Sequence, residues 1–412
     1  MISCPNYSYF YRYGHGNVFI LFICMFWING NRFRHFVTRI VSNMDKEYRQ
    51  IDGSHLEGGG QILRIATVLS SLLNIPIEIR NIRAGRPKPG LAPQHLHGLR
   101  IARDITNGQL LNAEIGSTSI QFCPSKINAG NYLTDIGTAG SVTLILQTAI
   151  PLLLYANGPS TLEIYGGTHV PFAPFVNFFT DILPDYLSFM KQIQIHCNRF
   201  GFYPQGGGHI TCQIDPTTIQ LPLQSIERID FGELNEINGF VMISGRIRRP
   251  IAESNIQSAM EIFYNQQPKM IDENRINIFI NECRTRNDVL AMMLSARTTT
   301  NCNLSSSSIV SRRNEMHTNI YGQKIAEKLC HDLEQQCCVD EFIQDQLIIY
   351  MALADGISRI ITGEISLHTQ TAIWITEQLT GVKFSIKLID QSKQLNMIEC
   401  KGLAYKPERY YS

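Results

Sequence analysis

The sequence predicts an α/β (α+β) fold in which repeated βαβαββ units form a large domain, with a smaller α+β domain inserted. Helix-periodic and strand-periodic segments alternate from Ile51 onward, and a comparable order recurs from Asn131 to Ile214. The stretch from about Ile226 to Cys337 is more polar and breaks this order. These three observations predict a repeated architecture interrupted by an insertion.

The first unit shows its elements in chain order. Apolar residues at helical spacing predict a helix over residues 61–73, and alternating isoleucines predict a strand over residues 75–80. A Gly/Pro-rich loop then leads to a second helix whose apolar face covers residues 96–105. Two short strands, around residues 113–115 and 120–122, complete the unit.

The second unit repeats this order. We predict an apolar helix over residues 141–156, a strand over residues 162–165 and a helix over residues 175–191. Paired strands follow around residues 193–197 and 209–214. Triple glycines occur in both units, before residue 61 and before residue 209, which also indicates repetition.

These patterns define the predicted domains. The large domain comprises residues 44–226 and 338–412, and the inserted domain comprises residues 227–337. Residues 1–43 form an N-terminal extension whose apolar run at residues 18–28 is too short to span a bilayer comfortably. This run fits the core of a signal peptide or presequence, but we favour a natural start at Met44.

Composition excludes some classes of protein. A chain of 412 residues with 44% hydrophobic and 17% charged residues has the composition of an ordinary globular protein. The net charge of +1 excludes a generally basic coat for nucleic acid, so any phosphate binding must be local. The 11 cysteines are scattered without a CxxC pair, which indicates free thiols in a reducing compartment.

The first candidate site is a glycine-rich turn before the first helix. Glu57 precedes three glycines, and Arg64 follows on the first turns of the helix. Glycines allow close approach of the backbone to a ligand, and a helix N-terminus offers free N–H donors to an anion. Glu57 is suited to a divalent cation that accompanies a phosphate. The alternative is a turn with a purely structural role.

The second candidate site is a basic loop. Arg83, Arg86 and Lys88 lie in a stretch stiffened by prolines, and His95 follows just beyond it. Three cations on a rigid loop form a local phosphate clamp. The alternative is a solvated basic loop.

The third candidate is His368. It follows a short extended run at residues 364–367 and precedes a helix-periodic stretch. A strand end that turns into a helix presents a side chain beside the free N–H groups of the first turn, which suits an imidazole that must meet a phosphate. The alternative is a histidine that only satisfies the helix start.

These motifs together resemble the RNA 3′-terminal phosphate cyclase family. The resemblance rests on residues 51–94, the run Gly201–Gly208, the triplet Asp345-Gln346-Leu347 and the run Leu367–Thr371. It extends from about residue 52 almost to the C-terminus, and residues 339–378 are especially similar to the animal cyclases. The large domain is then the catalytic domain.

The resemblance implies a chemistry and a set of site residues. His368 matches the nucleophile that attacks the α-phosphate of ATP to form histidyl-AMP. AMP then passes to the RNA 3′-phosphate, and the 2′-hydroxyl closes the 2′,3′-cyclic phosphate. Glu57 matches a metal contact, and Arg64, Arg83 and His95 match catalytic positions. The matched nucleotide contacts are Gln147, Pro174, Phe178, Phe342, Asp345, Gln346 and His368 itself.

The resemblance also implies the partners, which are ATP, a divalent cation (Mg²⁺ or Mn²⁺) and RNA with a 3′-phosphate end. It implies a nuclear or nucleoplasmic enzyme and no membrane; the oligomeric state stays open. Two alternatives remain. One is a non-cyclising relative that acts in RNA processing or ribosome biogenesis, against which His368 argues. The other is a phosphosugar or carboxyvinyl transferase built from similar repeats.

Overall fold

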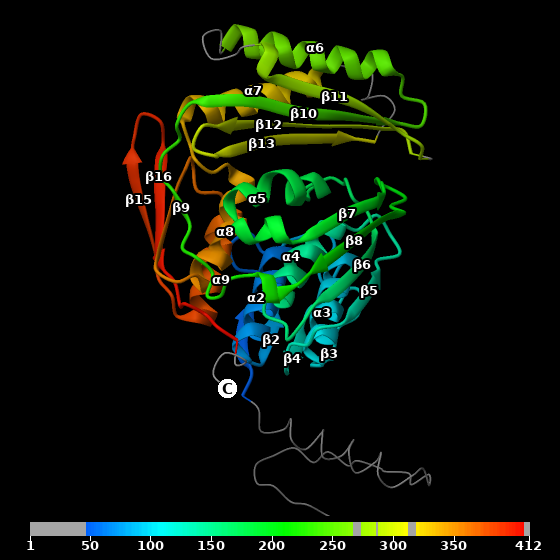
Figure 1. Ribbon diagram of the computed structural model, residues 1–412. Coiled ribbons are helices and arrows are strands. Elements are labelled where there is room, and N and C mark those ends of the chain that lie inside the picture. The colour runs from blue at the N-terminus through cyan, green and yellow to red at the C-terminus, as the bar shows by residue number, and fades with distance from the viewer. Residues whose placement is uncertain (1–46, 267–272, 286, 312–318, 408–412) are drawn as a thin grey trace, which may run out of the picture. The chain divides into compact units, whose positions relative to one another are not determined.

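The first βαβαββ unit occupies residues 49–123 of the computed structural model, which describes residues 47–266, 273–285, 287–311 and 319–407 (Figure 1). In chain order its elements are β1 (Arg49–Asp52), α2 (Gly60–Leu73), β2 (Ile77–Arg80), α3 (Pro93–Thr106), β3 (Gln109–Leu111) and β4 (Ile120–Cys123). The strands form a sheet in the order β1-β2-β4-β3, in which β1 and β2 are parallel and the other pairs antiparallel. Both predicted helices are confirmed, and each ends at an asparagine in the left-handed conformation, Asn74 or Asn107.

One strand prediction in this unit is wrong. The strand expected around residues 113–115 lies earlier, because Asn112 adopts φ 58° and ends β3 at Leu111. Residues 114–117 form a turn instead, closed by a hydrogen bond from the Ser117 N–H to the Glu114 carbonyl oxygen at 3.0 Å. Ile115 is therefore 68% exposed on that turn.

The second unit repeats the strand order of the first. Its elements are β5 (Asn131–Asp135), α4 (Val142–Leu153), β6 (Ser160–Gly166), η1 (Phe178–Ile182), α5 (Leu183–Tyr186), η2 (Ser188–Gln192), β7 (Gln194–Arg199) and β8 (Gly208–Ile214). The sheet order is β5-β6-β8-β7, with the same parallel and antiparallel pairs.

Two expectations for this unit are corrected. The single helix predicted over residues 175–191 is broken into a π-helix, an α-helix and a 3₁₀-helix. Pro184 has no N–H to continue the preceding turn, and Leu187 is extended (φ −119°, ψ 97°) between the last two pieces. The triple glycines are not equivalent either: one precedes α2, whereas the other lies in the β7–β8 connection.

A third unit of the same order closes the chain. Its elements are β9 (Glu227–Arg228), α8 (Glu341–Leu353), β14 (Ile357–Thr362), α9 (Leu367–Thr380), β15 (Phe384–Asp390) and β16 (Leu395–Lys401). Read from β9, the sheet order is β9-β14-β16-β15, with β9 and β14 parallel and the other pairs antiparallel. The short helix η3 (Pro216–Thr218) precedes β9. The predicted α/β class and the βαβαββ repetition are confirmed, with three units where the sequence showed two.

An extra layer lies between β9 and α8 in the chain. Its elements are β10 (Leu234–Ser244), α6 (Arg249–Gln266), η4 (Glu273–Arg275), β11 (Ile276–Cys283), β12 (Val289–Thr298), β13 (Asn303–Val310) and α7 (Ile320–Gln335). The sheet order is β11-β10-β12-β13. Helices α6 and α7 cover one face of this sheet, and α5 lies toward the other face (Figure 1).

Buried hydrogen bonds join this layer to the repeats. The hydroxyl of Tyr186 donates to the Cys338 carbonyl oxygen at 3.0 Å and accepts from the Asn303 backbone N–H at 2.9 Å. Burial raises the pKa of Tyr186 well above its usual value, so the hydroxyl remains a donor. The carboxylate of Asp340 accepts from the Ser305 backbone N–H at 2.8 Å and also caps α8.

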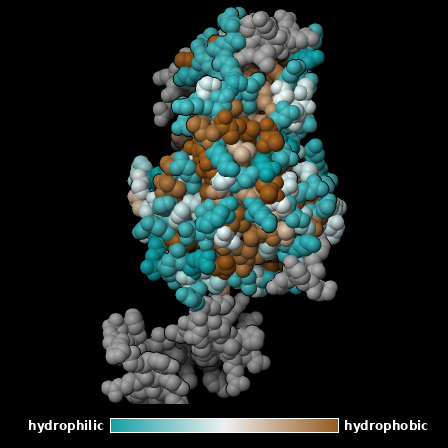
Figure 2. Space-filling model, turned by 90° about the vertical axis from the view of Figure 1, so that its left-hand side faces the viewer, coloured by the Kyte–Doolittle hydropathy of each residue, from teal (hydrophilic) through white to brown (hydrophobic). Residues whose placement is uncertain are grey.

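The third sheet ends in an apolar edge. Figure 2 shows hydrophobic side chains on the side of the molecule that carries β15 and β16. On β15, Ile386, Leu388 and Ile389 are each at least 44% exposed, and β15 is an edge strand. Apolar side chains and unpaired backbone groups therefore meet at this edge, which proteins usually protect with charge.

Two further expectations concern the whole chain. In the described ranges, no helix is long and apolar enough to cross a bilayer. Nine cysteines lie in these ranges, and no disulfide joins any two of them. The predicted extension at residues 1–43 and the proposed start at Met44 lie outside the described residues.

The substitution Tyr186→Phe tests the junction of the inserted layer with the repeats. It leaves a buried carbonyl and a buried N–H without partners, so we expect the free energy of unfolding to fall by about 1–3 kcal/mol. Urea denaturation measures this change. Tyr165→Phe, which removes a 3.4 Å surface hydrogen bond to Glu163, is the control and should change stability by less than about 0.5 kcal/mol. Equal effects of the two substitutions would contradict the assigned role of Tyr186.

Candidate active site

The glycine-rich turn brings two candidate residues together at the start of α2. Gly58 has φ +58°, a conformation that favours glycine. A Cβ atom on Gly59 would collide with the Glu57 carboxylate, and one on Gly60 would lie 2.5 Å from His95 Nε2. The absence of side chains at these two positions therefore lets Glu57 and His95 approach the first turn of α2.

Arg64 lies one turn further along α2. Its guanidinium donates to Gln61 Oε1 at 2.7 Å, and Gln61 Nε2 donates to Asp345 Oδ2 at 2.9 Å. Burial lowers the pKa of Arg64, while the charges of Asp345 and Glu57 oppose that shift. This chain of hydrogen bonds joins α2 to α8.

His95 is a neutral hydrogen-bond donor at this site. Burial lowers its pKa to about 3, and the neighbouring charges of Arg64 and Arg83 act in the same direction. The Ala92 N–H donates to His95 Nδ1 at 3.2 Å, so the ring proton resides on Nε2. That Nε2–H faces Gly60 beside Arg64, which suits it to donate to an anion there.

The basic loop completes the cationic side of the site. Arg83 donates to the Gly90 carbonyl oxygen at 2.8 Å, which closes the loop on itself. Arg86 forms an ion pair with Glu57 Oε1. Glu57 Oε2 is buried and has no hydrogen-bond partner among the described residues. A buried carboxylate oxygen without a partner is suited to a cation.

His368 stands at the start of α9, on the other side of the glycine-rich turn. Ser366 caps α9 by accepting from the Thr369 N–H at 3.1 Å, and His368 is exposed on the first turn. The Glu57 backbone N–H donates to the Thr371 hydroxyl at 3.2 Å, which holds α9 against the glycine-rich turn. The prediction of an extended run over residues 364–367 is wrong, because β14 already ends at Thr362 and α9 begins at Leu367.

Asp345 connects this histidine to the arginine. Burial raises the pKa of Asp345. Three neighbours act to lower it: the hydrogen bond from Gln346 (3.0 Å) has the largest effect, followed by the charges of His368 and Arg64. Arg64, Gln147, Asp345 and Gln346 line one cavity together with Phe179. These residues therefore bring one carboxylate, two amides and a guanidinium to the cavity, and Asp345 is close enough to His368 for the charge of the imidazole to oppose the rise in pKa.

Three predicted nucleotide contacts, Phe342, Pro174 and Phe178, are not in the described lining of this cavity. Phe342 is 43% exposed and shares a face of α8 with Asp345 and Gln346, three and four residues later. Pro174 is tied to α4 because its carbonyl oxygen accepts from the Thr143 hydroxyl at 2.8 Å. Phe178 is buried and is absent from the described lining of the cavity; Phe179 lines it instead.

Some residues of the site were not predicted from the sequence. Gln61 and Thr371 make the contacts that link α2 to α8 and to α9. Both lie inside motifs seen in the sequence, but nothing local showed these contacts. Arg86, expected in the phosphate clamp, also forms an ion pair with the carboxylate of Glu57.

Comparisons with known proteins point to one family. A family model described as RNA 3′-terminal phosphate cyclase matches residues 55–386. The chain is 38% identical to the RNA 3′-terminal phosphate cyclase of Drosophila melanogaster over 86% of this chain and 97% of that relative. The corresponding protein of Pyrobaculum aerophilum is 37% identical over 86% of this chain and 99% of its own length. The probable RNA 3′-terminal phosphate cyclase of Dictyostelium discoideum is 34% identical over 87% and 83%.

The pH dependence of stability tests the buried state of His95. The unfolded chain takes up a proton at this side chain below about pH 6.5, whereas the folded chain does so only near pH 3. Stability from this residue is thus present above pH 6.5 and is lost as the pH falls, by up to about 1.4 kcal/mol per pH unit. His95→Asn keeps an acceptor for the Ala92 N–H but does not titrate.

Urea denaturation between pH 7.5 and pH 5 measures the effect. We expect the free energy of unfolding of His95→Asn to fall less with acid than that of the wild type. The control His196→Asn, at an exposed histidine, should show the same pH dependence as the wild type. Identical pH profiles for His95→Asn and the wild type would refute the buried neutral state.

Proposed function

The chain belongs to the RNA 3′-terminal phosphate cyclase family and is an enzyme that acts on RNA ends, and from this premise we propose the course of its reaction. It converts an RNA 3′-terminal phosphate to a 2′,3′-cyclic phosphodiester with consumption of ATP. The observation that carries the proposal is the exposed imidazole of His368 at the start of α9, a helix held against the turn that carries Glu57, with Arg64 and the buried His95 close by.

The first step is adenylylation of His368. The lone pair of one ring nitrogen attacks the α-phosphorus of ATP, a P–N bond forms, and the bond to the bridging oxygen breaks as pyrophosphate leaves. The imidazole must be neutral to attack, and the other ring nitrogen releases its proton to solvent. Charge builds on the phosphoryl oxygens in the transition state, so fixed donors contribute most of the catalysis.

The donors for these oxygens come from two helices and one loop. Arg64 and the Nε2–H of His95 lie together at the first turns of α2, where backbone N–H groups are also free for an anion. Arg83 and Arg86 lie on the adjoining loop and supply further charge to the RNA phosphate. Because His95 is neutral, it donates without the cost of a buried imidazolium.

The second and third steps transfer AMP and close the ring. An oxygen of the RNA 3′-phosphate attacks the adenylate phosphorus, and the P–N bond to His368 breaks. The 2′-hydroxyl then attacks the activated 3′-phosphorus, loses its proton and expels AMP. Both displacements need in-line placement of two phosphoryl groups, which a rigid site bounded by α2 and α9 favours.

ATP is assigned to the surface around a small cavity of about 30 Å³, which lies beside Asp345 and receives only the polar edge of the nucleotide. Gln147, Asp345 and Gln346 line it, and they supply one carboxylate and two amides for the polar edges of a nucleotide. Phe342, on the same face of α8 as Asp345 and Gln346, and Pro174 are proposed to contact the base, and Phe178 packs against Phe179, which lines the cavity. The base can stack on the ring of Phe342, because stacking between rings does not need the hydroxyl group that a tyrosine would carry.

A divalent cation fits at Glu57. In the described residues no group of three His, Cys, Asp or Glu side chains forms a metal cage, but Glu57 offers one oxygen without a partner. One carboxylate together with phosphate oxygens and water is the usual environment of Mg²⁺, and Mn²⁺ accepts the same ligands. The ion would neutralise charge on the leaving pyrophosphate. The nuclear location implied by the resemblance stays a prediction.

Replacement of His368 tests the covalent step. We expect His368→Ala to lose all labelling by α-³²P-ATP in the presence of a divalent cation, and to lose cyclisation of a 3′-phosphorylated oligonucleotide. The label on the wild type should be acid-labile, as a phosphoramidate is. His331→Ala, at an exposed histidine on α7, is the control and should retain both activities.

Two outcomes would redirect the assignment. Cyclisation retained by His368→Ala would remove this residue from the mechanism. A wild-type protein that takes up no label and cyclises no RNA end would favour a non-cyclising role for this chain.

Replacement of Glu57 tests the cation site. Glu57→Gln removes the negative charge from the free oxygen, so we expect the metal concentration for half-maximal adenylylation to rise about tenfold or more. Titration with Mg²⁺ and Mn²⁺ measures this. Glu114→Gln, in the exposed β3–β4 connection, should leave the titration unchanged. An unchanged titration for Glu57→Gln would place the ion elsewhere.

A further inference from the structure

A second cavity, of about 320 Å³, lies where the second repeat meets the segment that leads into β9. Its lining comes from α5, η2, residues 219–228, Asn301 and Tyr350. Of the described residues that line it, none belongs to the cluster around His368. Tyr350 alone is shared with the cavity lined by Gln147 and Gln346.

Arg228 brings a positive charge without a carboxylate partner to this cavity. Its guanidinium donates to the carbonyl oxygens of Glu227 (2.8 Å) and Asp185 (2.5 Å), and lies 5.8 Å from the ring centroid of Tyr186. Nε is buried and has no hydrogen-bond partner, and no carboxylate in the described residues lies within 4.0 Å. Backbone carbonyls and a ring face orient this cation but do not neutralise it.

The other charges around the cavity leave this excess in place. Lys191 is exposed at the cavity and supplies a second cation. Asp185 is the single acid in the described lining, and its carboxylate is already occupied: it pairs with Arg297 at 2.9 Å and accepts from the Asn303 side chain at 2.7 Å. An anion that enters the cavity therefore meets two cations and no free carboxylate.

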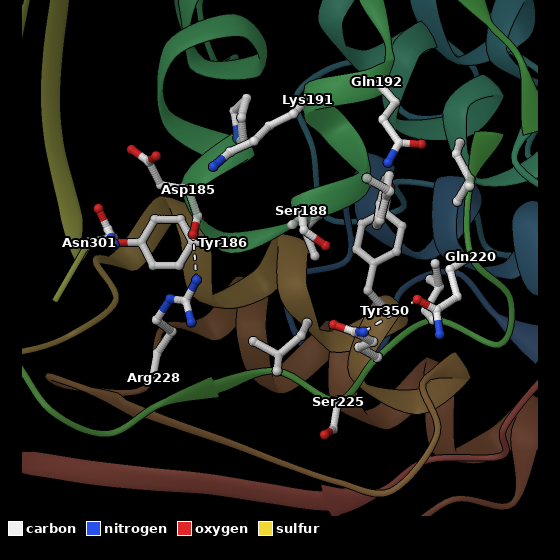
Figure 3. Close-up of a pocket in the computed structure, with 17 residues that line it drawn as sticks. Asp185, Tyr186, Ser188, Lys191, Gln192, Gln220, Ser225, Arg228, Asn301 and Tyr350 are labelled. Atoms are coloured by element: carbon white, nitrogen blue, oxygen red, sulfur yellow. Dashed lines mark hydrogen bonds between the residues drawn. The ribbon is translucent and has the colours of Figure 1, made fainter.

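The remaining walls are polar on one side and aromatic on another. Figure 3 shows Arg228, Lys191 and Asp185 on one side of the cavity and Tyr350 with Gln192 and Gln220 on the other. The amides and the serine hydroxyls of the lining can donate and accept hydrogen bonds. The ring of Tyr350 is packed against Phe189, with centroids 5.3 Å apart, and offers an apolar contact.

We propose that this cavity binds a small phosphate ester. Arg228 and Lys191 hold the phosphate by charge-assisted hydrogen bonds, and the amides, hydroxyls and Tyr350 receive the organic part. The volume is at the lower end of the range for ligand pockets, which fits a sugar phosphate or a mononucleotide rather than a longer chain. The site is distinct from the site proposed for ATP and RNA.

The first test locates the anion directly. Crystals of the full chain are soaked in tungstate, whose anomalous scattering marks a phosphate position. We expect a peak between Arg228 and Lys191, which is lost in crystals of Lys191→Gln and retained in those of Lys387→Gln, a control at an exposed lysine on β15. A peak confined to the cluster around Arg64 would overturn the proposal.

The second test measures the ligand class in solution. Ribose 5-phosphate is titrated calorimetrically into the full chain, with ribose as the comparison. We expect binding of the phosphate ester to one site that Lys191→Gln weakens roughly tenfold or more and Lys387→Gln leaves unchanged, and no binding of ribose. Arg228→Gln is made as well, with its stability measured separately, because Arg228 also joins β9 to α5.

Other results would refute the site. Equal affinity of ribose and ribose 5-phosphate, or an unchanged affinity in Lys191→Gln, would show that these cations do not bind a phosphate. Neither test requires catalytic turnover. The outcome is therefore independent of whether His368 is the nucleophile.

Discussion

The architecture of the site depends on keeping one guanidinium charged with little water around it. Removing Arg64 from water is costly unless hydrogen-bond acceptors and opposite charge replace the hydration. Gln61 accepts from Arg64 and donates to Asp345, a residue 284 positions later in the chain, and the charges of Asp345 and Glu57 complete the compensation. The hydrogen bonds that stabilise the charge of Arg64 thus also hold the first repeat against the third. One set of contacts therefore serves both the packing of the repeats and the cation that is proposed to bind an anion.

Much of the fold follows from local periodicity in the sequence. Where a prediction from that periodicity is wrong, the cause is also local. The helices α2, α3 and α4 were predicted because their apolar faces are regular. The single helix predicted over residues 175–191 was wrong because its middle is a π-helix and the extended backbone of Leu187 separates α5 from η2. The third repeat was not recognised, since its first strand has two residues and the inserted layer separates that strand from α8. A strand of two residues is too short to show a periodic pattern in the sequence, and it is recognised only by its pairing with β14.

For the site, too, local patterns in the sequence indicated some residues and missed others. Glycines and clustered cations indicated Glu57, Arg64 and Arg83, and a change from extended to helical pattern indicated His368. Gln61 and Thr371 were missed because their roles depend on partners about 300 residues away, which no local pattern contains. The aromatic positions came from resemblance to the family and stay predictions; Phe179, next to the predicted Phe178, lines the cavity.

The distance along the chain between Glu57 and Thr371 has a consequence for biosynthesis. The hydrogen bond between them spans 314 residues, and the helix that carries Thr371 also carries His368. A ribosome releases the basic loop long before it releases α8 and α9, so a prematurely terminated polypeptide lacks both Asp345, which compensates the charge of Arg64, and the imidazole of His368. The contacts that assemble this site therefore form only when translation is nearly finished.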